Sequence, residues 1–250
     1  FGHSQTLEYV GGNAAGAPQF IVACKTNTAY NERWSLQIGR VAYSAGKTIS
    51  YTSIPRLAGI SYANVSNASC GDAKRVDASV SPDMNKLVIW MQTTNNEVQY
   101  SFYDFKKILA LFDKKESAAS KYLYCNSDDV KSALLGSCKQ TAANCILPNG
   151  SFQGIQMDND YNLKISGGKE GQTPKIAYVT GSIASNKLYS CTWLYDANVN
   201  SSHFSDNKLE MEGIQLSSTC TGCVIRDTGF TANTGKYCIF SIDNKEFGIK

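Results

Sequence analysis

The sequence predicts an all-β fold, a β-propeller of four or five blades with a small, partly helical insertion. An acid or amide followed by a small residue recurs in four strand-like stretches, at Gln5, Asp77, Gln153 and Glu212. Each stretch is followed by a turn and two more strand-like stretches. A recurring unit of this kind favours radially repeated sheets over one mixed sheet. The abundance of Gly (20) and Tyr (14) fits a protein built of strands and turns.

Four repeats of this unit are expected within a single domain that spans residues 1–250. The repeats cover about residues 1–42, 74–106, 150–182 and 187–250. The second is the clearest, because the turn Ser81-Pro82-Asp83 precedes two stretches that alternate between apolar and polar residues. The marker residues lie 72, 76 and 59 residues apart, so we expect insertions between some of the repeats.

Residues 107–145 break the strand pattern and form the predicted insertion. The apolar residues in 108–112 have helical spacing. Ser127 is suited to cap a second, short helix that runs through Leu135 and ends at Gly136.

Composition limits the classes of partner. Charged residues make up 18% of the chain and the net charge is +3, which is too small to favour nucleic-acid binding. No apolar run approaches the roughly 18–20 residues that a membrane-spanning helix needs, so no transmembrane segment is expected. The chain starts at Phe1 without Met or an apolar signal segment, so we expect a processed form or a piece of a longer protein.

Nine cysteines are many for a cytosolic protein of this size, and they favour an oxidising compartment. We expect at least two disulfides, and the alternative is that several cysteines are small buried hydrophobic residues. The candidates form two groups, Cys125, Cys138 and Cys145 in one and Cys220, Cys223 and Cys238 in the other.

The candidate ligand-binding site is the mouth of a central channel. In a propeller the innermost strands face this channel, so the marker residues and one neighbour would line it. They are His3, Gln5, Asp77, Gln153 and Glu212. Such polar groups either line a water-filled pore or bind a ligand. Because the channel would be wet, we expect the variants Asp77→Ala and Glu212→Ala to fold normally.

No metal or cofactor site is expected. The run Asp158-Asn159-Asp160-Tyr161-Asn162 opens like a calcium loop, but Leu163 and Lys169 replace the Gly and Glu of an EF-hand, so we favour a turn. Cys220-Thr221-Gly222-Cys223 is a lone CxxC in a chain with two histidines, which disfavours zinc.

Enzyme activity is left open. Two histidines and the lack of a nucleophile-elbow sequence make a catalytic triad a weak hypothesis. Glycoside hydrolysis needs two carboxylates, and Asp77 and Glu212 would be the candidates. We favour binding or structural roles for them.

An ordered series of segments resembles the helveticin J family of large, heat-labile bacteriocins from the first residues to about residue 170. The segments are Gly2-His3-Ser4-Gln5-Thr6-Leu7-Glu8-Tyr9, Gln19-Phe20-Ile21-Val22, Trp34, Gln37-Ile38-Gly39-Arg40-Val41, Pro55-Arg56-Leu57, Ala78-Ser79-Val80-Ser81-Pro82-Asp83, Lys86, Gln153-Gly154 and Asp158-Asn159-Asp160.

The resemblance implies a secreted, extracellular antibacterial protein that acts on the envelope of related bacteria, with a surface glycan or wall polymer as the partner. It implies no catalytic residues. Family chains extend further upstream and are usually poor in cysteine. The resemblance therefore implies that an N-terminal part is missing here, and this chain departs from the family in its nine cysteines. The alternatives are a lectin-like carbohydrate-binding propeller that does not kill, and a glycosidase.

Overall fold

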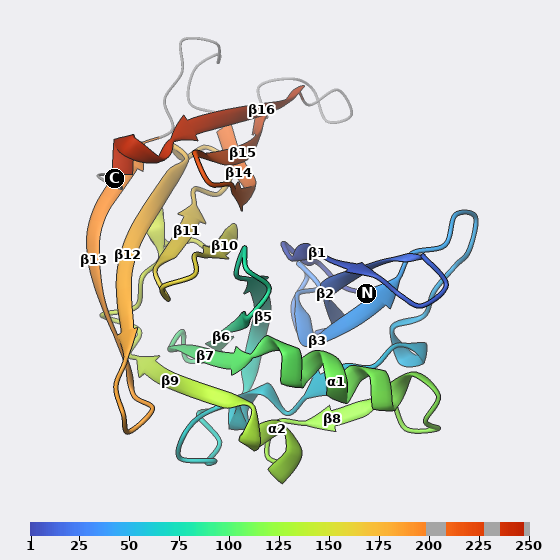
Figure 1. Cartoon of the computed structure of the whole chain (residues 1–250). Helices are drawn as coiled ribbons and strands as arrows, with labels where there is room; N and C mark the ends of the chain where they lie inside the picture. Colours follow the sequence, from blue (N-terminus) through green and yellow to red (C-terminus); the bar gives the residue numbers. More distant parts are fainter. Residues whose placement is uncertain (199–208, 228–235, 248–250) are drawn as a thin grey trace. The chain divides into compact units, whose positions relative to one another are not determined.

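The chain folds into two compact units (Figure 1). The computed structural model describes residues 1–198, 209–227 and 236–247. Unit 1 comprises Phe1–Cys145 and Ile183–Ser190, and unit 2 comprises the described residues of Ile146–Ser182 and Cys191–Lys250. The described strands form four small sheets. The predicted all-β propeller is therefore confirmed, with the four sheets as its blades.

The first sheet lies in unit 1 and has the strand order β1-β2-β3-β4-β8. Its strands are β1 (Leu7–Gly12), β2 (Pro18–Thr26), β3 (Ser35–Ala42), β4 (Arg56–Ala58) and β8 (Tyr122–Tyr124). Strands β4 and β8 pair in parallel, and the other neighbours are antiparallel. Asn13 closes the hairpin between β1 and β2, because its Oδ1 accepts hydrogen bonds from the backbone N–H groups of Ala15 and Ala17.

The second sheet of unit 1 has the order β5-β6-β7-β9. Its strands are β5 (Ala73–Val80), β6 (Lys86–Thr93), β7 (Val98–Asp104) and β9 (Leu134–Gln140). The predicted turn at Ser81-Pro82-Asp83 joins β5 to β6. Its geometry is fixed by Asp83, whose Oδ1 accepts from the Ser81 hydroxyl and from the backbone N–H of Asn85. Both faces of β6 and β7 are largely buried.

The predicted insertion contains two helices, α1 (Phe105–Glu116) and α2 (Asp128–Ser132). Asp104 caps α1 by accepting a hydrogen bond from the backbone N–H of Lys107. The second predicted helix was too long, because it ends at Ser132 and the next residues form β9. Gly136 does not end a helix. A Cβ there would lie 2.8 Å from the Lys187 carbonyl oxygen, so this glycine permits a close approach of two chain segments.

Unit 2 holds a sheet in the order β10-β11-β12-β13 and one in the order β14-β15-β16. Their strands are β10 (Gly154–Met157), β11 (Leu163–Gly167), β12 (Lys175–Ile183), β13 (Tyr189–Asn198), β14 (Leu209–Leu216), β15 (Cys220–Asp227) and β16 (Lys236–Asp243). Parts of the predicted fourth repeat, 187–250, lie outside the described residues. The described residues also form four short 3-10 helices: Tyr51–Ser53, Ile60–Tyr62, Pro148–Gly150 and Asn244–Phe247.

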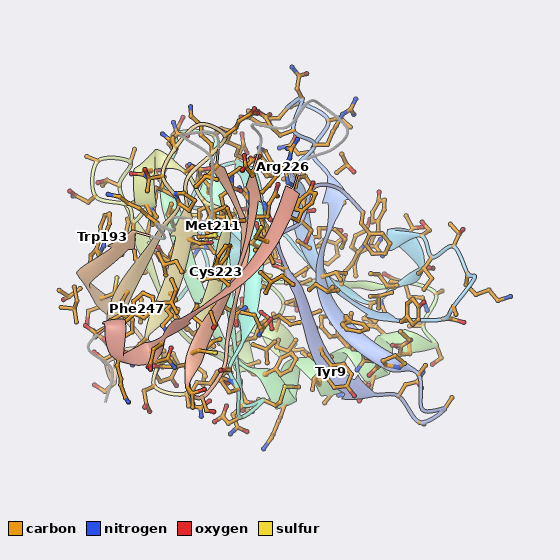
Figure 2. All side chains as sticks on the ribbon, turned by 90° about the horizontal axis from the view of Figure 1, so that it is seen from above. Tyr9, Trp193, Met211, Cys223, Arg226 and Phe247 are labelled. Atoms are coloured by element: carbon orange, nitrogen blue, oxygen red, sulfur yellow. The ribbon has the colours of Figure 1, made fainter. Side chains whose placement is uncertain are left out.

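Each unit has its own hydrophobic core. In unit 1 the core joins the two sheets to α1 through residues such as Ile21, Ile89 and Phe112. In unit 2 it includes Met211, Cys223 and Phe247, which Figure 2 labels. Among the described residues, no helix is both long enough and apolar enough to cross a membrane.

No disulfide bond joins any of the nine cysteines, all of which lie in the described parts of the chain, so neither predicted group is cross-linked here. Cys223 lies opposite Phe240 and Cys238 opposite Ile225, so these two cysteines are diagonal neighbours about 7–8 Å apart. That separation exceeds what a disulfide spans without movement of the backbone. Cys125 is buried against the Tyr103 hydroxyl, and burial raises the pKa of its thiol to about 12.

Candidate functional site

The five predicted site residues fall into two groups, each within one unit. His3, Gln5 and Asp77 belong to unit 1, and Gln153 and Glu212 belong to unit 2. Each of the five lies in, or within a few residues before, the first strand of its sheet, namely β1, β5, β10 or β14.

Asp77 anchors the N-terminal segment to the second sheet. Its side chain is 1% exposed, and Oδ1 accepts hydrogen bonds from the backbone N–H of Gln5 (3.1 Å) and from the Thr6 hydroxyl (3.0 Å). Oδ2 accepts from Nε of Arg75 at 3.0 Å. Both carboxylate oxygens thus bind groups of the protein itself. The sequence-based expectation of a wet carboxylate at this position is wrong for Asp77.

Arg75 and two rings form a stack beside this carboxylate. The Arg75 guanidinium carbon lies 3.8 Å from the centre of the Trp34 ring, and the exposed His3 ring lies 4.3 Å from Trp34 at an interplanar angle of 19°. Burial lowers the pKa of Arg75, and Asp77 opposes that shift. Because both partners pack on Trp34, this stack positions His3 at the surface.

In unit 2, Gln153 and Glu212 belong to a group that also contains Glu210 and Arg226. The Gln153 amide donates to Oε1 of Glu210 at 3.5 Å, and Nη1 of Arg226 donates to Oε2 of Glu210 at 3.4 Å. Arg226 is labelled in Figure 2. Sequence reasoning missed Glu210 and Arg226. The available signal was the Glu-x-Glu spacing, because alternate residues of a strand share a face.

Glu212 is half-buried at the bulge of β14, and burial raises the pKa of its carboxyl group, with Glu210 adding to the shift. The positive charge of Arg226 partly offsets this rise in the pKa of Glu212. The Glu210–Glu212 pair therefore holds a carboxyl group that gains a proton more readily than an exposed one.

The variant Glu212→Gln should be more stable than the wild type at neutral pH. Between the ordinary carboxyl pKa of 4.5 and the raised value, the folded state binds a proton that the unfolded chain has released. Stability therefore falls as pH rises through this window, and glutamine removes that loss. Thermal unfolding at pH 7 should show a higher Tm for the variant, and the difference should vanish below pH 4. Exposed Glu170→Gln is the matched control. Equal Tm values at pH 7 would contradict this account.

The acidic run at 158–162 forms the expected turn. Oδ1 of Asp158 accepts from the backbone N–H groups of Asp160 (2.7 Å) and Asn162 (3.0 Å), and Oδ2 accepts from the Asn162 amide at 2.7 Å. This is Asx-turn chemistry. Asp158 also lies near Lys164, and burial lowers the pKa of Lys164 to about 8. Nζ of Lys164 donates to Oδ1 of Asn244 at 2.6 Å.

Comparisons with known proteins identify similar chains. A family model described as "Bacteriocin helveticin-J" matches residues 1–236. The bacteriocin helveticin-J of Lactobacillus helveticus is 27% identical over 180 residues, which cover 67% of this chain and 52% of that protein, so this chain spans about half the length of its relative.

Two solved structures match this chain at low sequence identity. The extracellular domains 1–2 of Drosophila Semaphorin 1a give a TM-score of 0.45 at 9% identity, covering 97% of this chain and 56% of that one. Semaphorin 1b gives 0.39 at 11% identity, with 95% and 55% covered.

Proposed function

This chain belongs to the helveticin-J family of bacteriocins, and from that premise we propose that it is a secreted antibacterial protein that recognises a glycan or wall polymer in the envelope of related bacteria. The observation that carries the proposal is the family match over residues 1–236. Because the chain spans about half of its relative, killing by the whole protein is part of the proposal.

The unit 2 group supports the glycan part of the proposal. Glu210 and Glu212 on β14 offer carboxylate oxygens, and Arg226 on β15 and Gln153 just before β10 offer N–H donors. Sugar hydroxyl groups donate and accept hydrogen bonds at once, so mixed donors and acceptors of this kind suit them.

In unit 1 we assign direct contact with the glycan to His3 and Gln5, and a positioning role to Asp77. His3 is exposed and Gln5 is half-buried, whereas Asp77 is buried and holds the backbone that carries them. A group that touches a ligand must be reachable, and Asp77 does not meet that condition. For the same reason we do not assign Asp77 to glycoside hydrolysis.

The test combines adhesion and killing on Gram-positive indicator strains. We expect Glu212→Gln, and the double variant His3→Ala/Gln5→Ala, to weaken adhesion to susceptible cells at least tenfold, which corresponds to about 1.4 kcal/mol. Exposed Glu170→Gln should behave like the wild type. Unchanged adhesion and killing in both test variants would refute a glycan site at these residues.

The same assays separate the alternatives. Adhesion without killing would favour a lectin-like protein. Release of reducing sugars from isolated cell walls, lost in both Glu210→Gln and Glu212→Gln, would favour a glycosidase that uses this carboxylate pair. If neither adhesion nor killing occurs, the proposal fails.

A further inference from the structure

A cavity of about 640 Å³ opens in unit 1 between the β1–β2 hairpin and helix α1. Figure 1 shows α1 running alongside the first sheet. The polar residues that line the cavity come from the hairpin, from β2 and β3, and from α1. They are Asn13, Gln19, Arg40, Asp113 and Glu116.

Arg40 is the centre of this lining. Its side chain is 3% exposed and packs over Phe112. Nη1 donates to Oδ1 of Asp113 at 2.7 Å, and Nη2 donates to Oε1 of Glu116 at 2.8 Å. Its Nε has no hydrogen-bond partner among the residues that the structure describes.

The two carboxylates keep capacity for a ligand. Each uses one oxygen on Arg40, and their side chains are 70% exposed at Asp113 and 48% exposed at Glu116. They lie three residues apart on α1, so they share one face of the helix. The guanidinium holds both in place, and their second oxygens remain open to solvent as acceptors.

Gln19 is a second polar side chain of the lining with hydrogen-bonding capacity for a ligand. It is 8% exposed and lines the cavity, yet its amide makes no hydrogen bond within the described part of the chain. Its amide N–H and C=O groups are therefore available to a ligand that occupies the cavity. Asn13 also lines the cavity, and its Oδ1 already accepts hydrogen bonds within the hairpin.

We infer that this cavity binds an uncharged saccharide. Planar carboxylate and amide groups pair with the neighbouring hydroxyls of a sugar ring, and the cavity combines both kinds. Two negative charges and one positive charge leave the polar lining with a net charge of −1, which repels phosphate-rich polymers. The inference rests on the proposed function and narrows it, because it selects neutral glycans over anionic wall polymers.

The test uses an array that carries uncharged microbial oligosaccharides beside glycerol-phosphate and ribitol-phosphate oligomers. We expect the wild type to bind at least one uncharged oligosaccharide and none of the phosphate oligomers. The double variant Asp113→Asn/Glu116→Gln should bind the same oligosaccharide with at least tenfold lower affinity. The asparagine and glutamine side chains of this variant each keep an oxygen that can accept a hydrogen bond from Arg40. Circular dichroism checks that the variant folds. Asp129→Asn, on the exposed face of α2, is the matched control.

Three outcomes would overturn the inference: binding to no uncharged oligosaccharide, preference for the phosphate oligomers, or unchanged binding by the folded double variant. The killing assay is independent of all three. A wild type that kills but shows one of these outcomes refutes the neutral-saccharide cavity and leaves the antibacterial proposal standing. A wild type that does not kill refutes the antibacterial proposal, whatever the array shows.

Discussion

Replacing Asp77 with alanine should lower the free energy of unfolding by about 3–5 kcal/mol, the range found when one partner of a buried ion pair is removed. Arg75 is 4% exposed and would keep its charge without its carboxylate. The backbone N–H of Gln5 and the Thr6 hydroxyl would lose an acceptor at the same time. The N-terminal segment should then detach from β5, and the ring stack of His3 on Trp34 should loosen.

Denaturant unfolding followed by tryptophan fluorescence measures this loss, because Trp34 lies in the affected stack. The variant Asp77→Asn should lose less free energy of unfolding than Asp77→Ala does, since the asparagine amide oxygen can still accept one of these hydrogen bonds. Asp72→Ala removes an exposed carboxylate just before the same strand and should change stability by less than about 0.5 kcal/mol. A loss below about 1 kcal/mol for Asp77→Ala would show that the buried network contributes little.

Replacing Arg56 with methionine should cost about 2–4 kcal/mol, because several hydrogen bonds to a charged group are lost together. Arg56 is 3% exposed. Its Nη1 donates to the carbonyl oxygens of Tyr51, Thr52 and Ile54 at 3.1 Å each, and its Nε donates to Gln37. The guanidinium also lies 4.0 Å from the centre of the Tyr122 ring.

This one side chain joins the 3-10 turn before β4 to the parallel strand β8. Methionine fills a similar volume but satisfies none of the carbonyl groups. Urea unfolding should therefore show a lower midpoint for Arg56→Met, while the exposed Arg33→Met should match the wild type. Equal midpoints for the two variants would mean that water replaces the guanidinium at little cost.

The strands of the second sheet were predictable from the sequence because their signals are local. The turn at Ser81-Pro82-Asp83 and the two alternating stretches that follow it correspond to the turn that joins β5 to β6 and to the strands β6 and β7. The helical spacing in 108–112 likewise identified α1. In each case neighbouring residues carry the whole pattern.

The pairing of β4 with β8 and the strand β9 were not predictable in this way. β4 and β8 have three residues each, and their partners lie 66 positions apart, as Arg56 pairs with Tyr122. The sequence around Leu134 and Gly136 predicts the end of a helix. In the structure these residues belong to β9, which pairs with β7 through backbone hydrogen bonds. Intrinsic helix propensity is a weak preference, and the hydrogen bonds that a segment gains by joining an existing sheet override it.

For the candidate site, the sequence by itself determined which polar residues recur at equivalent positions, and it predicted one channel mouth for all five of them. The structure groups only His3, Gln5 and Asp77 in unit 1. Only the tertiary structure decided what each of them does. Asp77 is buried because Arg75, 2 residues away on the same strand, supplies a charge that makes burial tolerable. The cavity at Arg40 depends on a helix that starts 65 residues later in the chain. Burial and charge pairing depend on distances between segments, and sequence order does not contain those distances.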